Sequence, residues 1–70
     1  MKPSLEFSVE ASDTSLVVDT ARAAAGDALD RITVAPIDGT PRFRIIITLQ
    51  RESMKAVMKA VMLALDGKPA

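Results

Sequence analysis

Cysteine and histidine are both absent from this chain, and its only aromatic side chains are Phe7 and Phe43. Without Cys or His, the chain cannot form disulfides, build the usual zinc sites or supply a thiol nucleophile or an imidazole acid–base group. Glu6 and Glu10 can share one strand face, but nothing pairs a nucleophile with a base. We therefore expect no catalytic residue, no metal site and no cofactor, and predict that the protein is not an enzyme.

Long apolar runs are also absent. No run approaches the roughly 20 residues that a bilayer span needs, and residues 1–10 lack the apolar centre of a signal peptide. We therefore predict a cytoplasmic protein with no membrane partner. A basic strip on this chain would have no exposed aromatic side chain beside it for stacking on bases, so no nucleic-acid partner is expected either. The basic residues considered for that strip are Arg42, Arg44, Arg51, Lys55 and Lys59.

The chain has 70 residues, of which 49% are hydrophobic and 26% charged, the balance of a folded chain. This length makes one domain, residues 1–70, near the lower limit at which a core alone stabilises a fold. Self-association is therefore expected. Net charge is zero, but residues 1–30 hold two basic and six acidic side chains, and residues 31–70 hold seven and three. The two halves can complement each other within the fold or across a dimer.

Three segments are predicted to be strands. Residues 5–11 and 42–50 alternate apolar and polar side chains at period two, which is typical of half-buried strands. The expected core-facing residues are Leu5, Phe7, Val9 and Ala11 in the first segment, and Phe43, Ile45, Ile47 and Leu49 in the second. Residues 31–36 contain the β-branched Ile32, Thr33 and Val34 and end at Pro36, and Asp38-Gly39 predicts a hairpin turn. The isoleucine-rich strand of residues 42–50 is expected to lie centrally.

Two amphipathic helices are predicted. Residues 12–15 offer several N-caps for the first, which Gly26 should end in a left-handed conformation. Ser53 is the expected N-cap of the second, over residues 54–65, with Gly67 and Pro69 after its end. The expected buried stripes are Val17, Ala21, Ala24 and Ala28 in the first, and Met54, Val57, Met58, Val61 and Leu65 in the second. We interpret the repeated Met-Lys-Ala-Val as a packing face of adaptable methionine, with a promiscuous binding groove as the alternative.

This order of elements predicts an α+β, ferredoxin-like sandwich of β-α-β-β-α order, in which both helices cover one face of a three-stranded antiparallel sheet. The other face is then open, with Ile46 between Arg44 and Thr48. If Ile46 joins Ala35 or other small residues there, a two-fold dimer would cover the patch, and we predict an interface at Arg44, Ile46 and Thr48. The alternative is that Ile46 is a scattered exposed residue.

Residues 26–38, which read Gly-Asp-Ala-Leu-Asp-Arg-Ile-Thr-Val-Ala-Pro-Ile-Asp, are followed by a strand that contains Arg-Ile-Ile-Ile at residues 44–47. This stretch resembles an ACT domain and is most similar to those of acetohydroxyacid synthase regulatory subunits. The matching residues are Gly26, Leu29, Ile32, Thr33, Val34, Ala35, Pro36 and Asp38. The resemblance implies an ACT-like fold, a homodimer or a subunit of a larger enzyme, and a small amino-acid ligand.

Such a ligand would lie between the strand-to-helix turn of one protomer, at Asp13 and Thr14, and Ala28 and Leu29 of its neighbour, since free amides at a helix N-terminus attract a carboxylate. The turn lacks the glycine of amino-acid-binding ACT domains, and Ala28 stands where the regulatory subunits have Asn. We therefore predict a small non-catalytic protein-interaction or regulatory module, homodimeric, with an amino-acid-sensing regulatory subunit of a biosynthetic enzyme as the alternative.

Overall fold

The computed structural model describes residues 3–67 of the chain. Three strands and two helices follow one another as β1 (Ser4–Glu10), α1 (Thr14–Ala25), β2 (Leu29–Pro36), β3 (Arg42–Leu49) and α2 (Met54–Asp66). Short 3₁₀ turns lie beside the helices, at η1 (Ala11–Asp13), η2 (Gly26–Ala28) and η3 (Arg51–Ser53). This order and the antiparallel sheet confirm the predicted α+β, ferredoxin-like fold class. No helix within residues 3–67 is long and apolar enough to cross a bilayer.

The central strand of the sheet is β3, which pairs antiparallel with β1 on one side and β2 on the other. This confirms the position predicted from its isoleucine content. Ile47 lies opposite Leu5 of β1 and Ile32 of β2, whereas Ile46 lies opposite Glu6 and Thr33. Because successive side chains point to opposite faces, one face of the sheet is aliphatic and the other is largely polar.

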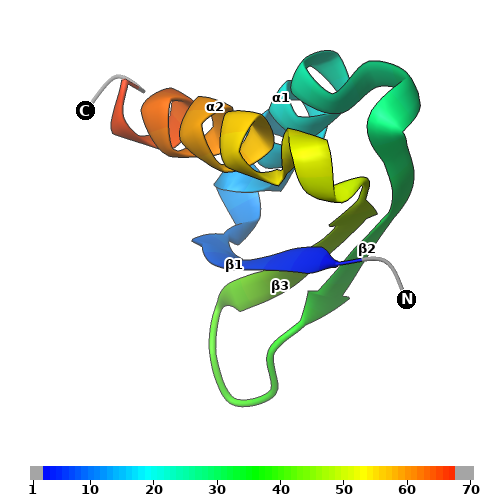
Figure 1. The fold of residues 1–70 in the computed structure, drawn as a ribbon. Coiled ribbons are helices and arrows are strands. Elements are labelled where there is room, and N and C mark those ends of the chain that lie inside the picture. Colours follow the sequence, from blue (N-terminus) through cyan, green and yellow to red (C-terminus); the bar gives the residue numbers. More distant parts are fainter. Residues whose placement is uncertain (1–2, 68–70) are drawn as a thin grey trace.

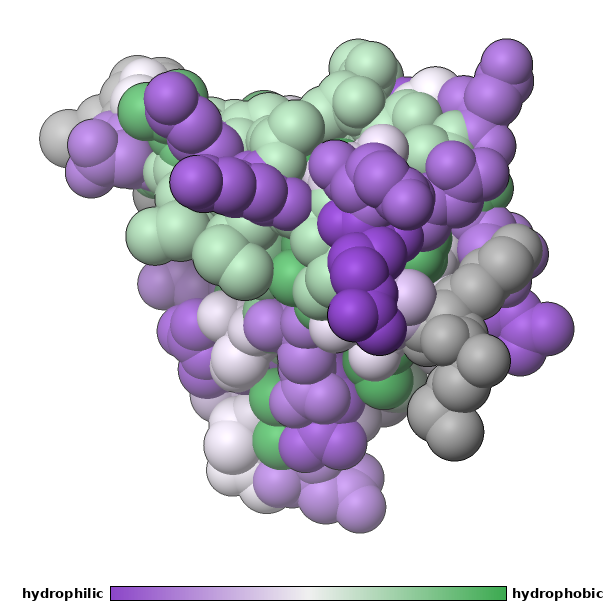
Figure 2. Space-filling view, in the orientation of Figure 1, coloured by the Kyte–Doolittle hydropathy of each residue, from purple (hydrophilic) through white to green (hydrophobic). Residues whose placement is uncertain are grey.

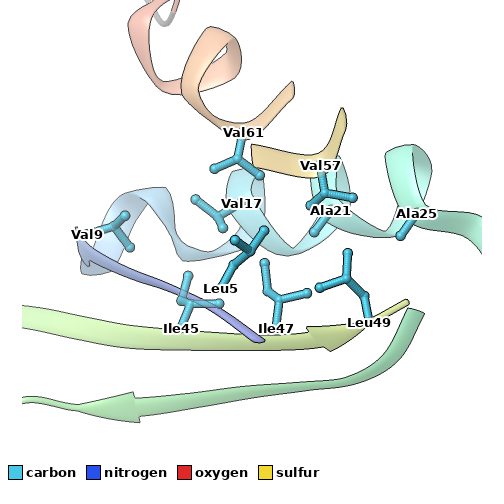
Figure 3. Close-up of a cluster of buried hydrophobic side chains, with 10 residues drawn as sticks. All are labelled: Leu5, Val9, Val17, Ala21, Ala25, Ile45, Ile47, Leu49, Val57 and Val61. Atoms are coloured by element: carbon cyan, nitrogen blue, oxygen red, sulfur yellow. The ribbon is translucent and has the colours of Figure 1, made fainter. Parts of the chain in front are cut away.

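Both helices lie side by side over the aliphatic face, as predicted, and the β2–β3 hairpin extends beyond them (Figure 1). The core fills the space between the helices and the sheet (Figure 3). Its buried members are Leu5, Val9, Val17, Ala21, Ala25, Ile45, Ile47, Leu49, Val57 and Val61. The core is wholly aliphatic, and Phe7 packs against it only half-buried. The opposite face of the sheet has no helix over it in residues 3–67.

Three strand ends differ from the prediction. β1 stops at Glu10, because Ala11 begins the turn η1 and is exposed instead of joining the core. β2 starts at Leu29, where an irregularity in pairing between Leu29 and Arg31 fits an extra residue into the ladder. β3 stops at Leu49, and the backbone N–H of Gln50 donates instead to the carbonyl of Ala28 at 3.0 Å.

Gly26 ends α1 with a positive φ, as expected, but not in the left-handed helical conformation. Its φ is 53° and its ψ is −125°, which match the first central residue of a type II′ turn. A left-handed helical residue has ψ near about +47°. A Cβ on Gly26 would meet nothing within 4 Å, so the requirement for glycine comes from the backbone conformation and not from crowding.

The predicted N-cap Ser53 stands at the N-cap position of α2, and Asp13 stands at that of α1. Neither side chain makes a capping hydrogen bond to the helix. The reason is that each residue ends a 3₁₀ turn, with ψ near zero, whereas a capping side chain needs an extended backbone. Gly67 follows the end of α2 as predicted, and its N–H donates to Leu63 at 2.9 Å. Pro69 lies outside the described residues.

The buried stripes differ from prediction at two positions in α1 and at one in α2. In α1, Ala25 is buried and Ala24 is exposed, since Ala25 continues the four-residue spacing of Val17 and Ala21. Ala28 lies beyond the helix, half-buried in η2. In α2, the expected packing position Met58 is 42% exposed. Met58 directly follows the buried Val57, and one residue rotates a side chain by about 100° around a helix.

Candidate functional site

The turn from β1 to α1 brings Asp13 and Thr14 together at the start of α1. Asp13 is buried, and the Thr14 hydroxyl donates to the carbonyl of Ala11 at 2.9 Å. Two depressions of about 460 and 220 Å³ adjoin this turn, and Glu10 and Arg42 line both of them. A ligand carboxylate entering here would meet a guanidinium but also the carboxylates of Glu10 and Asp13.

Ala28 and Leu29 lie beyond the other end of α1. The helix between them and Asp13 has 12 residues, and at 1.5 Å per residue it is about 18 Å long. The carbonyl of Ala28 already accepts the N–H of Gln50. One chain therefore does not bring the four predicted ligand residues together. The amino-acid site needs two protomers and stays a prediction.

The predicted interface residues Arg44, Ile46 and Thr48 lie in a row along β3 on the open face of the sheet. Arg44 Nε lies 3.4 Å from a carboxylate oxygen of Glu6 on β1. Ile46 is half-buried between Glu6 and Thr33 in the register, and Ala35 lies opposite Arg44 instead. Ile46 therefore has polar strand neighbours, and its role in an interface stays a prediction.

The outer edge of β1 is partly covered by Arg42 from β3. The N–H of Leu49 donates to the carbonyl of Pro3 at 3.2 Å, so odd-numbered residues of β1 direct their backbone groups toward β3 and even-numbered residues direct theirs outward. Arg42 Nε donates to the Ser8 hydroxyl at 3.0 Å, and Nη2 donates to the Ser8 carbonyl. A cation held on an outward carbonyl obstructs the addition of another strand at this edge.

The basic residues considered for a nucleic-acid surface divide between the two layers of the fold. Arg42 and Arg44 interact on the sheet with Ser8 and Glu6 of β1. Lys55 and Lys59 instead belong to the exposed side of α2, in the helical layer. Arg51 lies in η3, between these two groups.

Apolar side chains gather on the outward face of α2. Four large hydrophobic residues of the described chain are exposed, and three of them are Met58, Met62 and Leu63, at 42%, 58% and 61%. They line a depression of about 830 Å³ that lies wholly along this helix. We call this surface the α2 patch, and it consists of Lys55, Met58, Lys59, Met62, Leu63, Leu65 and Asp66. Figure 2 shows apolar side chains spread over the helical layer, with long hydrophilic side chains lying across them.

The sequence indicates a methionine-bearing binding groove on this helix only as the alternative, and it does not single out Met62 or Leu63. It predicts Met58 in the packing face, because a run of apolar residues in one helix does not reveal where its buried face stops. The signal that could have found them is the buried pair Val57 and Val61. Measured around the helix from these two residues, Met62 and Leu63 point away from the core.

No group of three or more acidic side chains within residues 3–67 is arranged to hold a metal ion. No protein-family model, curated protein or solved structure matches this chain. The ACT resemblance therefore stays a prediction from the residues quoted for it, and the α2 patch is assigned on its geometry alone.

Proposed function

We propose that this protein is a small non-catalytic module that docks onto another protein through the α2 patch. The observation that supports this most directly is that Met58, Met62 and Leu63 are exposed together on one surface. Apolar area in contact with water is unfavourable by about 25 cal/mol per Å². A partner that covered these side chains would remove that cost, and exposed apolar clusters commonly mark interaction sites.

The composition of the patch supports the same conclusion. Its apolar members lie among the charged side chains of Lys55, Lys59 and Asp66. An apolar centre with a polar rim is the usual arrangement of a protein interface, in which methionine is enriched. Methionine is flexible and polarisable, so it adapts to the shape of a partner. Two exposed methionines therefore fit a docking surface better than a surface required only for solubility.

The patch is also carried on a well-anchored element. On the opposite side of α2, Val57 and Val61 are completely buried against α1 and the sheet. Leu65, at the margin of the patch, packs against the same core. A surface held on a packed helix does not need to become ordered when a partner binds, which favours affinity.

The carboxylates of β1 support a role without catalysis. Glu6 pairs with Arg44 at 3.4 Å, and Glu10 lies opposite Arg42 in the register. Opposite charges at facing positions of neighbouring strands stabilise a sheet, which gives both carboxylates a structural role. The shared strand face of Glu6 and Glu10 is therefore explained by an ion pair for Glu6 and by a facing cation for Glu10.

The proposal is tested by substituting Met62→Lys in the tagged full chain and identifying the proteins recovered from the native cells. Met62 is 58% exposed, so the substitution should leave the thermal midpoint and the circular dichroism spectrum unchanged. A charge in the apolar part of the patch must lose its water when a partner covers it, so we expect the proteins bound by the wild type, including further copies of the chain, to be lost.

The matched control is Val34→Lys, which places the same charge on the other large exposed hydrophobic residue, 43% exposed and located on β2. This variant should keep the partners of the wild type. If Met62→Lys recovers the same proteins as the wild type, or if both variants lose them equally, the α2 patch is not the docking surface.

A further inference from the structure

The charges at the two ends of α2 have the wrong sign for their own helix. Lys55 is the second residue of the helix and Asp66 is its last. A helix has partial positive charge at its N-terminus and partial negative charge at its C-terminus, so a cation at the start and an anion at the end are both unfavourable. Within α2 itself, no acidic residue stands in the first turn and no basic residue in the last, although the acidic Glu52 precedes the N-cap Ser53.

An antiparallel copy of the same helix reverses this disadvantage. Lys55 would then lie beside the C-terminus of the other helix, close to its Asp66, and Asp66 would lie beside the other N-terminus. Both charges would meet an opposite charge and the favourable end of a helix. The end charges of α2 are therefore unfavourable in an isolated helix and favourable beside an antiparallel copy of the same helix, which makes α2 complementary to itself.

The apolar members of the α2 patch follow the same symmetry. With a two-fold axis level with the midpoint between Ala60 and Val61, Met58 lies at the same height as Leu63 of the other copy, as Lys55 does with Asp66. At about 100° per residue, Lys55 and Asp66 lie near the middle of the patch and can face each other, whereas Met58 and Leu63 lie on its opposite flanks and border the contact on either side. Lys59 lies opposite Met62, where its aliphatic stem can cover the thioether.

We infer that the partner of the α2 patch is a second copy of this chain, bound with the two α2 helices antiparallel about a two-fold axis. The inference rests on the proposed function of the patch and names its partner. The β1 edge and the open face of the sheet fit a second copy less well, because Arg42 covers part of that edge and Glu6 pairs with Arg44 on that face. A helix of 13 residues is about 20 Å long. A contact of one such helix from each chain buries less area than a standard protein interface, so the dimer should be weak and reversible.

The test uses charge reversal in the full chain, with Lys55→Glu, Asp66→Lys, and the two substitutions combined. Each single variant turns two attractive pairs of the dimer into two repulsive ones, which should raise the dimer dissociation constant about tenfold. Each also corrects the charge order within its own helix, so the monomer should not lose thermal stability. Loss of association with an unchanged or raised thermal midpoint thus separates an interface effect from unfolding.

The double variant restores two attractive pairs but places each charge beside the unfavourable end of the other helix, so its dissociation constant should lie between those of the wild type and the single variants. An equimolar mixture of the two single variants should form a mixed dimer more readily than either variant alone, because one chain is then acidic at both ends of α2 and the other is basic. Sedimentation equilibrium from about 10 µM to about 1 mM measures each constant.

A wild type that stays monomeric over that range would overturn the inference. So would a dimer that is insensitive to both single reversals, or one that is disrupted by Ile46→Lys on the open face. These failures are distinct from failure of the proposed function. If the chain is monomeric while Met62→Lys still abolishes binding of a different protein, the patch is a docking surface and only its partner was misidentified.

Discussion

Three consecutive isoleucines on β3 allow the two faces of the sheet to be compared with the same side chain. Ile45 and Ile47 are completely buried under the helices, whereas Ile46 points to the open face and is half-buried. Substituting each in turn by alanine removes the same atoms from neighbouring positions of one strand. The loss of stability should therefore report burial alone.

The expected magnitudes follow from the packing. Truncation of a fully buried isoleucine to alanine costs about 2–5 kcal/mol, and we expect about 3 kcal/mol for Ile45→Ala and for Ile47→Ala. A 70-residue domain has a total stability of about 4–10 kcal/mol. Either substitution thus removes a large share of the total. Ile46→Ala should cost about 1 kcal/mol, since Ile46 loses only partial burial and some strand propensity.

Urea unfolding followed by circular dichroism measures these differences. With a slope near 1 kcal/mol per molar urea, the buried truncations should lower the midpoint by about 3 M and the Ile46 truncation by about 1 M. If the alanine variants at positions 45 and 47 do not fold, isoleucine-to-valine substitutions provide a milder series. They should cost about 1 kcal/mol at the buried positions and almost nothing at position 46.

The reasoning is refuted if Ile46→Ala costs as much as Ile47→Ala in dilute protein, because the two faces would then be equally buried within one chain. A cost at Ile46 that grows with protein concentration has a different meaning. It would indicate that a second molecule covers the open face, as the predicted interface of Arg44, Ile46 and Thr48 requires, and it would contradict a dimer through α2.

Two further predictions concern the ends of α1. Gly26→Ala should lower the free energy of unfolding by about 1–3 kcal/mol, since alanine is strained at a φ of 53°. Asp27→Ala, at the next and exposed position, should change it by less than about 0.5 kcal/mol, and equal effects in urea unfolding would contradict this. Calorimetric titration with branched-chain amino acids should give no heat, because Thr14 bonds within its turn and Asp13 would repel a carboxylate. Saturable heat would instead favour the amino-acid-sensing alternative.

The sequence by itself determined the elements, their order and the central position of β3. The period-two alternation around Ile45 and Ile47 can be satisfied only by a strand with one buried face, and Gly26 can end a helix at a positive φ where other residues are strained. These signals are local, since each depends on residues within a few positions of one another. For that reason the predicted helices and strands agree with the observed ones to within one or two residues at their ends.

Only the tertiary structure decided which surfaces are available. Met58 and Val57 are adjacent and both apolar, and the position of α1 and the sheet buries one and exposes the other. Arg42 and Ser8 are 34 positions apart, and strand pairing brings the guanidinium onto the edge of β1. Contacts of this kind depend on how separate elements pack, which no local pattern encodes. The α2 patch can be defined only when the structure shows which apolar side chains of α2 are buried in the core.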